Sequence, residues 1–149
     1  MDKMQGGHQA LQIRLLNGRI FQKLLSKEPD ALYRSEQGKI LTILWKQELE
    51  CATATDIALA TGLANNTLTS MVKKLEEQGL VTIQPCTQDK RKKYISLTEL
   101  GWEQKEIGDR VSKELGEIFY QGFSDQEIQE FEAYQERIIS NLKAKENDI

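Results

Sequence analysis

Large apolar residues recur near the start of the chain at the spacing of an amphipathic helix. From about Ala10 to Ser26 they are three or four positions apart and fall on one helical face. These residues are Ile13, Leu16, Ile20 and Leu24, with Leu15, Phe21 and Leu25 beside them. Such a broad apolar surface needs cover on more than one side, most easily from another subunit. Residues 1–9 are polar and Gly-rich, so we expect a mobile segment with His8 on the surface before the helix.

A second helix is predicted after a connection that contains Pro29 and Asp30. Ser35 is a good N-cap, and the helical pattern continues to about Gln47. The apolar stripe of this helix consists of Ile40, Leu41, Leu44 and Trp45. We expect this helix to lie beneath the elements that follow and to support them.

Two longer helices are predicted at the C-terminal end. Thr98 is placed to cap a helix from Glu99 to about Gln121, and Ser124 with Glu127 forms a capping box for the last helix. Apolar residues follow the helical period in both: Leu100, Ile107, Val111, Leu115 and Ile118, then Ile128, Phe131, Ile138 and Leu142. A monomeric bundle is one possibility. We favour a dimer whose interface is made by the first helix and the last two.

The middle of the chain reads as two short helices joined by a glycine-containing turn, the arrangement of a helix-turn-helix. The first helix runs from its N-cap Thr53 to Gly62, which suits a left-handed C-terminal position. The second begins at Asn65 or Asn66, both good caps, and runs to Gln78.

The second of these short helices has two unlike faces. Leu68, Val72 and Leu75 are four and three positions apart and share one apolar stripe. Such a helix can pack by one side and present the other to base edges in the major groove. We predict that its polar and cationic side chains contact DNA, the first four at base edges and the two lysines at phosphate or guanine: Asn66, Thr67, Thr69, Ser70, Lys73 and Lys74.

A β-hairpin is predicted directly after this helix. Leu80–Gln84 favours a strand, and Lys93–Leu97 alternates apolar and polar residues as a return strand does. The connection between them carries Lys90, Arg91 and Lys92. A basic hairpin beside a recognition helix is a wing that lies along the phosphate backbone or reaches the minor groove. We therefore predict that these three residues bind DNA, with Arg91 in the minor groove.

The order of these motifs resembles the multiple-antibiotic-resistance regulator (MarR) family of bacterial transcription factors. A helix-turn-helix is followed by E-x-x-G-L-V, a D-x-R-x-K tip and a strand that ends L-T-x-x-G. The matching residues are Leu75, Glu76, Gly79, Leu80, Val81, Asp89, Arg91, Lys93, Leu97, Thr98 and Gly101. One departure is Ala64, where the family usually has a Ser or Asp cap. We expect the cap to shift to Asn65.

The resemblance covers nearly the whole chain and implies its fold and partners. It implies one mainly α domain over residues 1–149, with a winged helix-turn-helix core at 35–98 and dimerisation helices at 10–26 and 99–145. It implies a triangular homodimer that represses transcription from a palindromic double-stranded operator. A small effector, often aromatic or phenolic, would bind between the dimerisation helices and the core and release the DNA. Possible lining residues are Arg14, Phe21, Tyr33 and Trp45, although core packing explains the three aromatic residues better.

Asp89 has two possible roles in the predicted wing. A carboxylate has no use against phosphate, so it can instead hold an arginine by a bidentate pair, and the family resemblance supports this role. Asp89 can equally be an ordinary turn residue.

The charge distribution supports a DNA-binding core in an acidic protein. The net charge is −3, but residues 65–94 carry six Lys/Arg against three Asp/Glu, whereas residues 99–149 carry six against thirteen. The positive charge therefore coincides with the predicted recognition helix and wing.

The two cysteines, Cys51 and Cys86, leave a second regulator hypothesis open. They lack the spacing of a zinc motif, and ordinary reduced thiols are the favoured interpretation. The alternative is a thiol-based redox-responsive regulator of the same fold that uses Cys51 or Cys86. A third hypothesis, from another class, is a winged-helix interaction module that does not bind DNA.

The remaining sequence features argue against other classes of protein. No motif for a nucleophile, a phosphate-binding loop or a metal cluster is present, so we predict no enzymatic activity, no cofactor and no metal. No apolar run approaches the roughly 20 residues of a membrane span. We therefore expect a cytoplasmic protein without a membrane partner.

Overall fold

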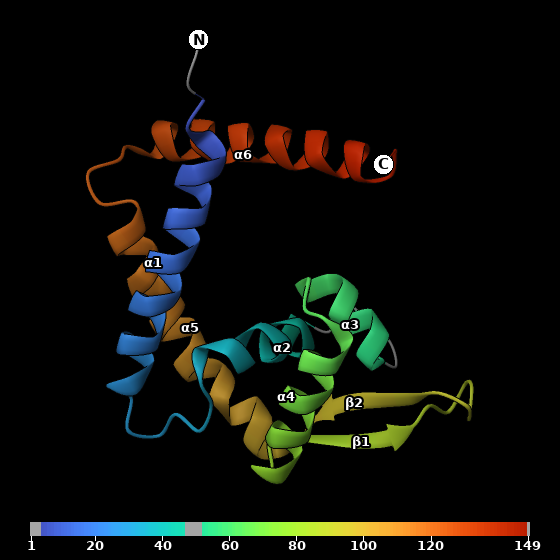
Figure 1. The fold of residues 1–149 in the computed structure, drawn as a ribbon. Helices are drawn as coiled ribbons and strands as arrows, with labels where there is room; N and C mark the ends of the chain where they lie inside the picture. The colour runs from blue at the N-terminus through green and yellow to red at the C-terminus, as the bar shows by residue number, and fades with distance from the viewer. Residues whose placement is uncertain (1–3, 47–51, 149) are drawn as a thin grey trace. The chain divides into compact units, whose positions relative to one another are not determined.

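The computed structural model describes residues 4–46 and 52–148 of the chain. Within these residues it contains six helices and one two-stranded antiparallel hairpin, which confirms the predicted fold class (Figure 1). In chain order they are α1 (Gly6–Ser26), α2 (Ser35–Lys46), α3 (Ala54–Thr61), α4 (Asn65–Glu77), β1 (Val81–Pro85), β2 (Lys93–Leu97), α5 (Glu99–Phe119) and α6 (Asp125–Glu146). The chain divides into two compact units, residues 1–115 and 116–149.

The core of the first unit is built around α2. This helix contacts α1, α3, α4 and β2, and its Ile40 and Leu41 are fully buried. The apolar stripes predicted for α2 and α4 both face this core. Its most completely buried side chains are Leu25, Ile40, Leu41, Ile57, Leu68, Leu75, Leu80 and Val81. The indole Nε1 of Trp45 donates to the carbonyl of Gly101 at 3.0 Å, which attaches α2 to the start of α5.

The second unit is a turn of aromatic residues followed by α6. Ser124 and Glu127 form the predicted capping box at the start of α6. The rings of Phe119, Tyr120 and Phe131 pack around this turn, and the Tyr120 hydroxyl donates to Glu132 at 2.8 Å. None of the described residues of α6 is buried. In its predicted apolar stripe, Ile138 and Leu142 are each more than half exposed.

The predicted start of α1 is wrong by one helical turn. The helix begins at Gly6, so His8 lies inside it, although on the exposed side as expected. The amide of Gln9 donates to the carbonyl of Gln5 at 2.8 Å, which extends the helix through both glycines. Glycine lowers helix propensity by about 1 kcal/mol but does not prevent helix formation.

Two predicted caps are also wrong. Ser35 is the first helical residue of α2, because the carbonyl of Arg34 accepts from Gly38 and therefore occupies the N-cap position. In α4 the N-cap is Ala64, whose methyl group accepts no hydrogen bond, rather than Asn65 or Asn66. Gly62, at φ 77°, and the packing of Leu63 against the core fix how the chain enters α4. This entry needs no side-chain cap.

The remaining element boundaries agree closely with the sequence prediction. Thr53 caps α3 in a capping box with Asp56, and Thr98 Oγ1 accepts from the amide of Gly101 at 3.0 Å at the start of α5. Strand β1 begins one residue later than expected and includes Pro85, which pairs with Lys93. Helix α5 ends at Phe119, two residues before the predicted end.

Candidate nucleic-acid interface

Helix α4 presents a continuous polar face to solvent. Leu68, Val72 and Leu75 are buried in the core, which fixes the rotation of the helix about its axis. All six side chains predicted to contact DNA are consequently exposed: Asn66, Thr67, Thr69, Ser70, Lys73 and Lys74. The structure therefore brings together on one surface the residues that the sequence pattern assigned to it.

The turn before α4 and the end of α4 both depend on left-handed glycines. Gly62 closes α3 at φ 77°, and Gly79 follows α4 at φ 79°. The amide of Leu80 donates to Leu75 at 2.9 Å, and that of Gly79 donates to Glu76 at 3.0 Å. This pair of bonds is a Schellman motif, which ends the helix and directs the chain into β1.

The start of α5 holds the end of α4 in place. The hydroxyl of Thr98 donates to the carbonyl of Gly79 at 2.6 Å, and the amide of Thr98 donates to Leu80 at 3.1 Å. Gly101 is buried against the same segment, and a Cβ there would lie 2.1 Å from the carbonyl oxygen of Leu80. Glycine is required at this position because the two backbones approach so closely.

The hairpin extends beyond α4 (Figure 1). Cross-strand hydrogen bonds stabilise it, between Thr82 and Ser96 at 3.0 Å and from the Tyr94 hydroxyl to Gln84 at 2.7 Å. The cationic residues Lys90, Arg91 and Lys92 are all exposed in the connection between the strands.

Asp89 holds Arg91 by a bidentate pair. The Arg91 Nε donates to Asp89 Oδ1 at 3.1 Å and its Nη2 to Oδ2 at 3.2 Å. Asp89 also shapes the turn, since Oδ1 accepts from the Arg91 amide at 3.0 Å and the Asp89 carbonyl accepts from Lys92 at 3.0 Å. The contacts of both predicted roles are thus present. The hydrogen bonds from Arg91 lower the pKa of the Asp89 carboxyl, so the pair is ionised near neutral pH.

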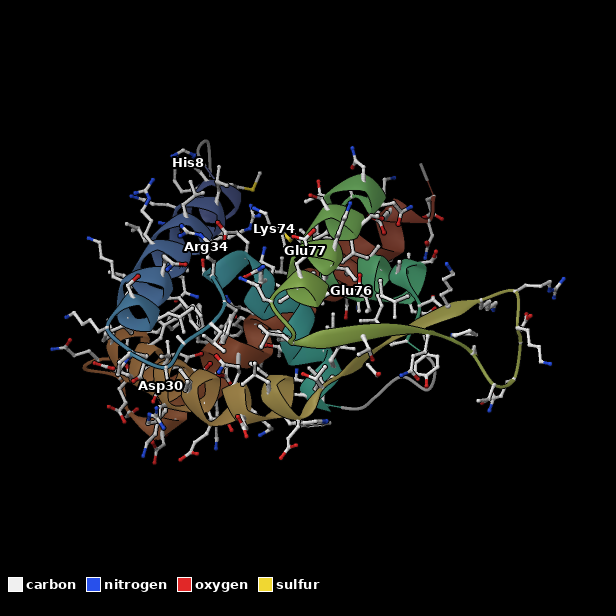
Figure 2. All side chains as sticks on the ribbon, turned by 90° about the horizontal axis from the view of Figure 1, so that it is seen from below. His8, Asp30, Arg34, Lys74, Glu76 and Glu77 are labelled. Carbon is white, nitrogen blue, oxygen red and sulfur yellow. The ribbon has the colours of Figure 1, made fainter. Side chains whose placement is uncertain are left out.

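The polar face of α4 borders a groove that the sequence did not indicate. Its opposite wall is the start of α2, including Arg34, Glu36 and Gln37. Figure 2 labels three of its lining residues, Arg34, Lys74 and Glu77. Arg34 lies in the predicted connection before α2, and local spacing carries no information about Lys74, which lines the same groove forty positions later.

The four residues predicted to line an effector site differ in their surroundings. Tyr33 and Trp45 belong to the core, with ring centroids 5.9 Å apart and an angle of 71° between the rings. Phe21 packs at the edge of the core, whereas Arg14 is exposed on α1. Burial, assisted by Asp109, raises the pKa of Tyr33 to about 12. Among the described residues the Tyr33 hydroxyl has no hydrogen-bond partner, although it is buried.

The two cysteines differ in what the structure shows. Cys86 is buried directly after β1, where the connection to β2 begins, and its amide donates to the carbonyl of Lys92 at 2.9 Å. Cys51 lies outside the described residues. In the described part of the chain there is no group of three or more His, Cys, Asp or Glu residues that could hold a metal ion. Nor is any described helix both long and apolar enough to cross a membrane.

A buried-stripe helix with a polar outer face, preceded by a glycine turn and followed by a basic hairpin, defines a winged helix-turn-helix protein of the DNA-binding class. Residues 34–93 match the model of the MarR family. This match spans α2, α3, α4, β1 and the connection of the wing, and it supports the resemblance found in the sequence.

Individual proteins are similar to the chain as well. The HTH-type transcriptional repressor IacR of Pseudomonas putida is 28% identical over 78 residues, which cover 52% of this chain and 47% of that protein. The chain thus matches about half the length of this curated relative. The S. aureus MepR–DNA complex superposes with a TM-score of 0.81 at 22% identity, covering 93% of this chain and 99% of MepR. Bordetella bronchiseptica BpsR, whose DNA binding is regulated by 6-hydroxynicotinic acid, has a TM-score of 0.76 at 21% identity, covering 94% and 96%. These two structural likenesses establish the shared fold.

Proposed function

We propose that the protein is a dimeric transcriptional repressor that binds a palindromic operator and is released by a small aromatic or phenolic ligand. The observation that carries this proposal is the exposed polar face of α4 together with the cationic wing. The repressor name of the relative from Pseudomonas putida supports the direction of regulation.

Each part of the surface has a separate task in this proposal. Asn66, Thr67, Thr69 and Ser70 contact base edges in the major groove, and Lys73 and Lys74 contact phosphate or guanine. Lys90 and Lys92 neutralise phosphates beside the groove. Arg91 enters the minor groove, where the negative potential is concentrated, and Asp89 holds its guanidinium in a fixed orientation.

Exposed apolar side chains support a dimer. On α1, Leu11, Leu15 and Leu16 are each close to half exposed. On α6, Ile138 is 55% and Leu142 is 66% exposed. A soluble monomer seldom leaves so many large apolar residues on regular helical faces, and a second copy of the chain would cover them. Two copies of α4 would then meet half-sites about 10 base pairs apart.

The proposed effector site lies where α1, α2 and α5 meet. It is supported by the buried Tyr33 hydroxyl beside Trp45 and Gly108, and by BpsR, whose DNA binding responds to 6-hydroxynicotinic acid. Arg14 on α1 supplies a cation that could pair with the carboxylate of such a ligand.

The test is selection of a DNA sequence followed by titration. The purified protein is offered a random duplex pool, and the intergenic DNA beside its own gene is titrated at several salt concentrations. We expect one palindromic sequence to bind far more tightly than scrambled DNA, and Arg91→Ala to weaken that binding. Lys113→Ala, which removes an exposed lysine from α5 remote from α4 and the wing in sequence, is the matched control and should bind as the wild type.

Two other outcomes distinguish the competing hypotheses. If the wild type selects no sequence, the interaction-module hypothesis gains and the repressor proposal is wrong. If oxidation abolishes binding and Cys86→Ser or Cys51→Ser prevents that loss, the thiol-responsive regulator replaces the ligand-responsive one. If the wild type selects a sequence and oxidation leaves its binding intact, aromatic carboxylic acids, including 6-hydroxynicotinic acid, are added to the same assay to test for release of the DNA.

A further inference from the structure

A buried glutamine joins α2 to the end of α4. Gln37 lies in the first turn of α2 and is only 5% exposed. Its Oε1 accepts from the amide of Arg34 at 2.9 Å, and its Nε2 donates to Oε1 of Gln78 at 3.2 Å. Gln78 is the C-cap residue of α4. Both ends of one buried side-chain amide are therefore bonded, one to the entry of α2 and the other to the end of the proposed recognition helix.

The connector between α1 and α2, residues 27–34, is itself held from two sides. Gln104 of α5 is 3% exposed, accepts from the amide of Leu32 at 2.9 Å and donates to the carbonyl of Asp30 at 3.2 Å. Gln22 of α1 accepts from the amide of Ser35 at 2.8 Å, directly after the connector. Hydrogen bonds of three glutamines thus lead from α1 and α5, through the connector, to the end of α4.

We infer that Gln37 is a positioning residue for DNA recognition, which sets the orientation of α4 through its hydrogen bond to Gln78 and links that orientation to the connector. The inference rests on the proposed function, since it takes α4 to be the element that reads DNA. Tyr33 lies in the same connector. A ligand that moved Tyr33 would therefore act on the amide of Arg34, then on Gln37, and finally on the end of α4.

The surroundings of the two residues separate positioning from simple folding. Leu68, Val72 and Leu75 already bury α4 in the core, and Gln78 is exposed, so the fold does not depend on the Gln78 side chain. Loss of the Gln78 oxygen leaves a buried donor on Gln37 without its acceptor, which favours a small shift of the helix end. Base contacts are sensitive to such a shift, whereas contacts to phosphate tolerate it.

The experiment compares Gln78→Leu with the wild type on two duplexes, one selected by the wild type from a random pool and one scrambled sequence of equal length. We expect roughly tenfold weaker binding to the selected duplex, the effect of one lost buried hydrogen bond, and almost unchanged binding to the scrambled one. The double variant Glu77→Gln/Gln78→Glu keeps the net charge and an acceptor at position 78, so it should restore discrimination.

A double-mutant cycle then assigns the effect to the pair. Gln37→Leu should lose at least as much discrimination as Gln78→Leu, because it also removes the acceptor of the Arg34 amide. Adding Gln78→Leu to Gln37→Leu should cause no further loss. Equal losses on both duplexes, or strictly additive effects, would overturn the inference.

Hydrogen exchange tests the link without DNA. The amides of Gly79 and Leu80 close the Schellman motif, and in Gln78→Leu they should exchange about tenfold faster, the rate change for one lost hydrogen bond. Unchanged exchange of these two amides contradicts the link between Gln37 and the end of α4, even if the wild type binds its selected duplex. Failure of the wild type to select any sequence contradicts the proposed function instead, so the two failures are distinguishable.

Discussion

Replacing Gly101 by alanine should destabilise the protein strongly at the contact between α5 and the end of α4. The added Cβ would lie 2.1 Å from the carbonyl oxygen of Leu80 and 3.0 Å from a methyl group of Leu97. A carbon and an oxygen need ~3.3 Å, so one of the two backbones must move by roughly 1 Å. That displacement strains the bond from the Thr98 amide to Leu80 and the bond from Trp45 to the Gly101 carbonyl.

The size of the effect follows from these contacts. Overpacking of a well-packed site costs about 1–3 kcal/mol, and weakening a buried hydrogen bond adds about 1 kcal/mol. Alanine regains roughly 0.5–1 kcal/mol of helix propensity over glycine. We therefore expect Gly101→Ala to lower the free energy of unfolding by about 2 kcal/mol.

Another glycine in the same helix provides the control. A Cβ at Gly116 meets no atom within 4 Å, so Gly116→Ala should raise the free energy of unfolding by roughly 0.5–1 kcal/mol. Urea denaturation at one fixed protein concentration measures both changes and holds any dimerisation constant. If Gly101→Ala proved as stable as the wild type, the close approach of α5 to the end of α4 would be refuted.

Three further predictions concern the wing, the core and the proposed subunit interface. Nuclear magnetic resonance titration should give Asp89 a pKa below the ordinary value, and Arg91→Ala should raise that pKa. The contribution of the pair to stability is present at higher pH and is lost as the pH falls through the lowered pKa of Asp89. An unchanged pKa of Asp89 in the variant would exclude the pair. The pKa of Tyr33 is raised from 10.0 to about 12, so the neutral phenol stabilises the fold below pH ~10 and this contribution is lost between about pH 10 and 12. The free energy of unfolding of Tyr33→Phe should consequently fall less steeply with pH in that range. At pH ~7 the variant should be at least as stable as the wild type, because the hydroxyl has no hydrogen-bond partner among the described residues. A large loss of stability at neutral pH would show that the hydroxyl is hydrogen-bonded. Leu142→Glu should shift the protein towards the monomer in analytical ultracentrifugation, whereas Gln126→Glu, on an exposed part of the same helix, should not. If both variants remained dimers, the interface would lie elsewhere.

The sequence determined the secondary-structure elements and which side of α4 is polar and exposed. The periodicity of Leu68, Val72 and Leu75 identified the buried side of α4 and so the exposed side as well. The wing followed from two short strand patterns around a cationic turn, and its Asp89–Arg91 pair joins residues two positions apart. These features depend on neighbouring residues, whose geometry is fixed by the periods of helix and strand.

Only the tertiary structure decided how these elements are held together. Gln37 and Gln78 are 41 positions apart, and no local pattern predicts that their amides meet. The same holds for Gly101, which is small because the backbone of Leu80 passes close to it. The local sequence around Ala64 predicts a side-chain cap for α4 at Asn65, whereas the packing of Leu63 and the left-handed Gly62 fix the start of this helix without one. Short-range hydrogen bonding and periodicity define the elements, whereas contacts between distant residues form only once the apolar faces are buried against one another.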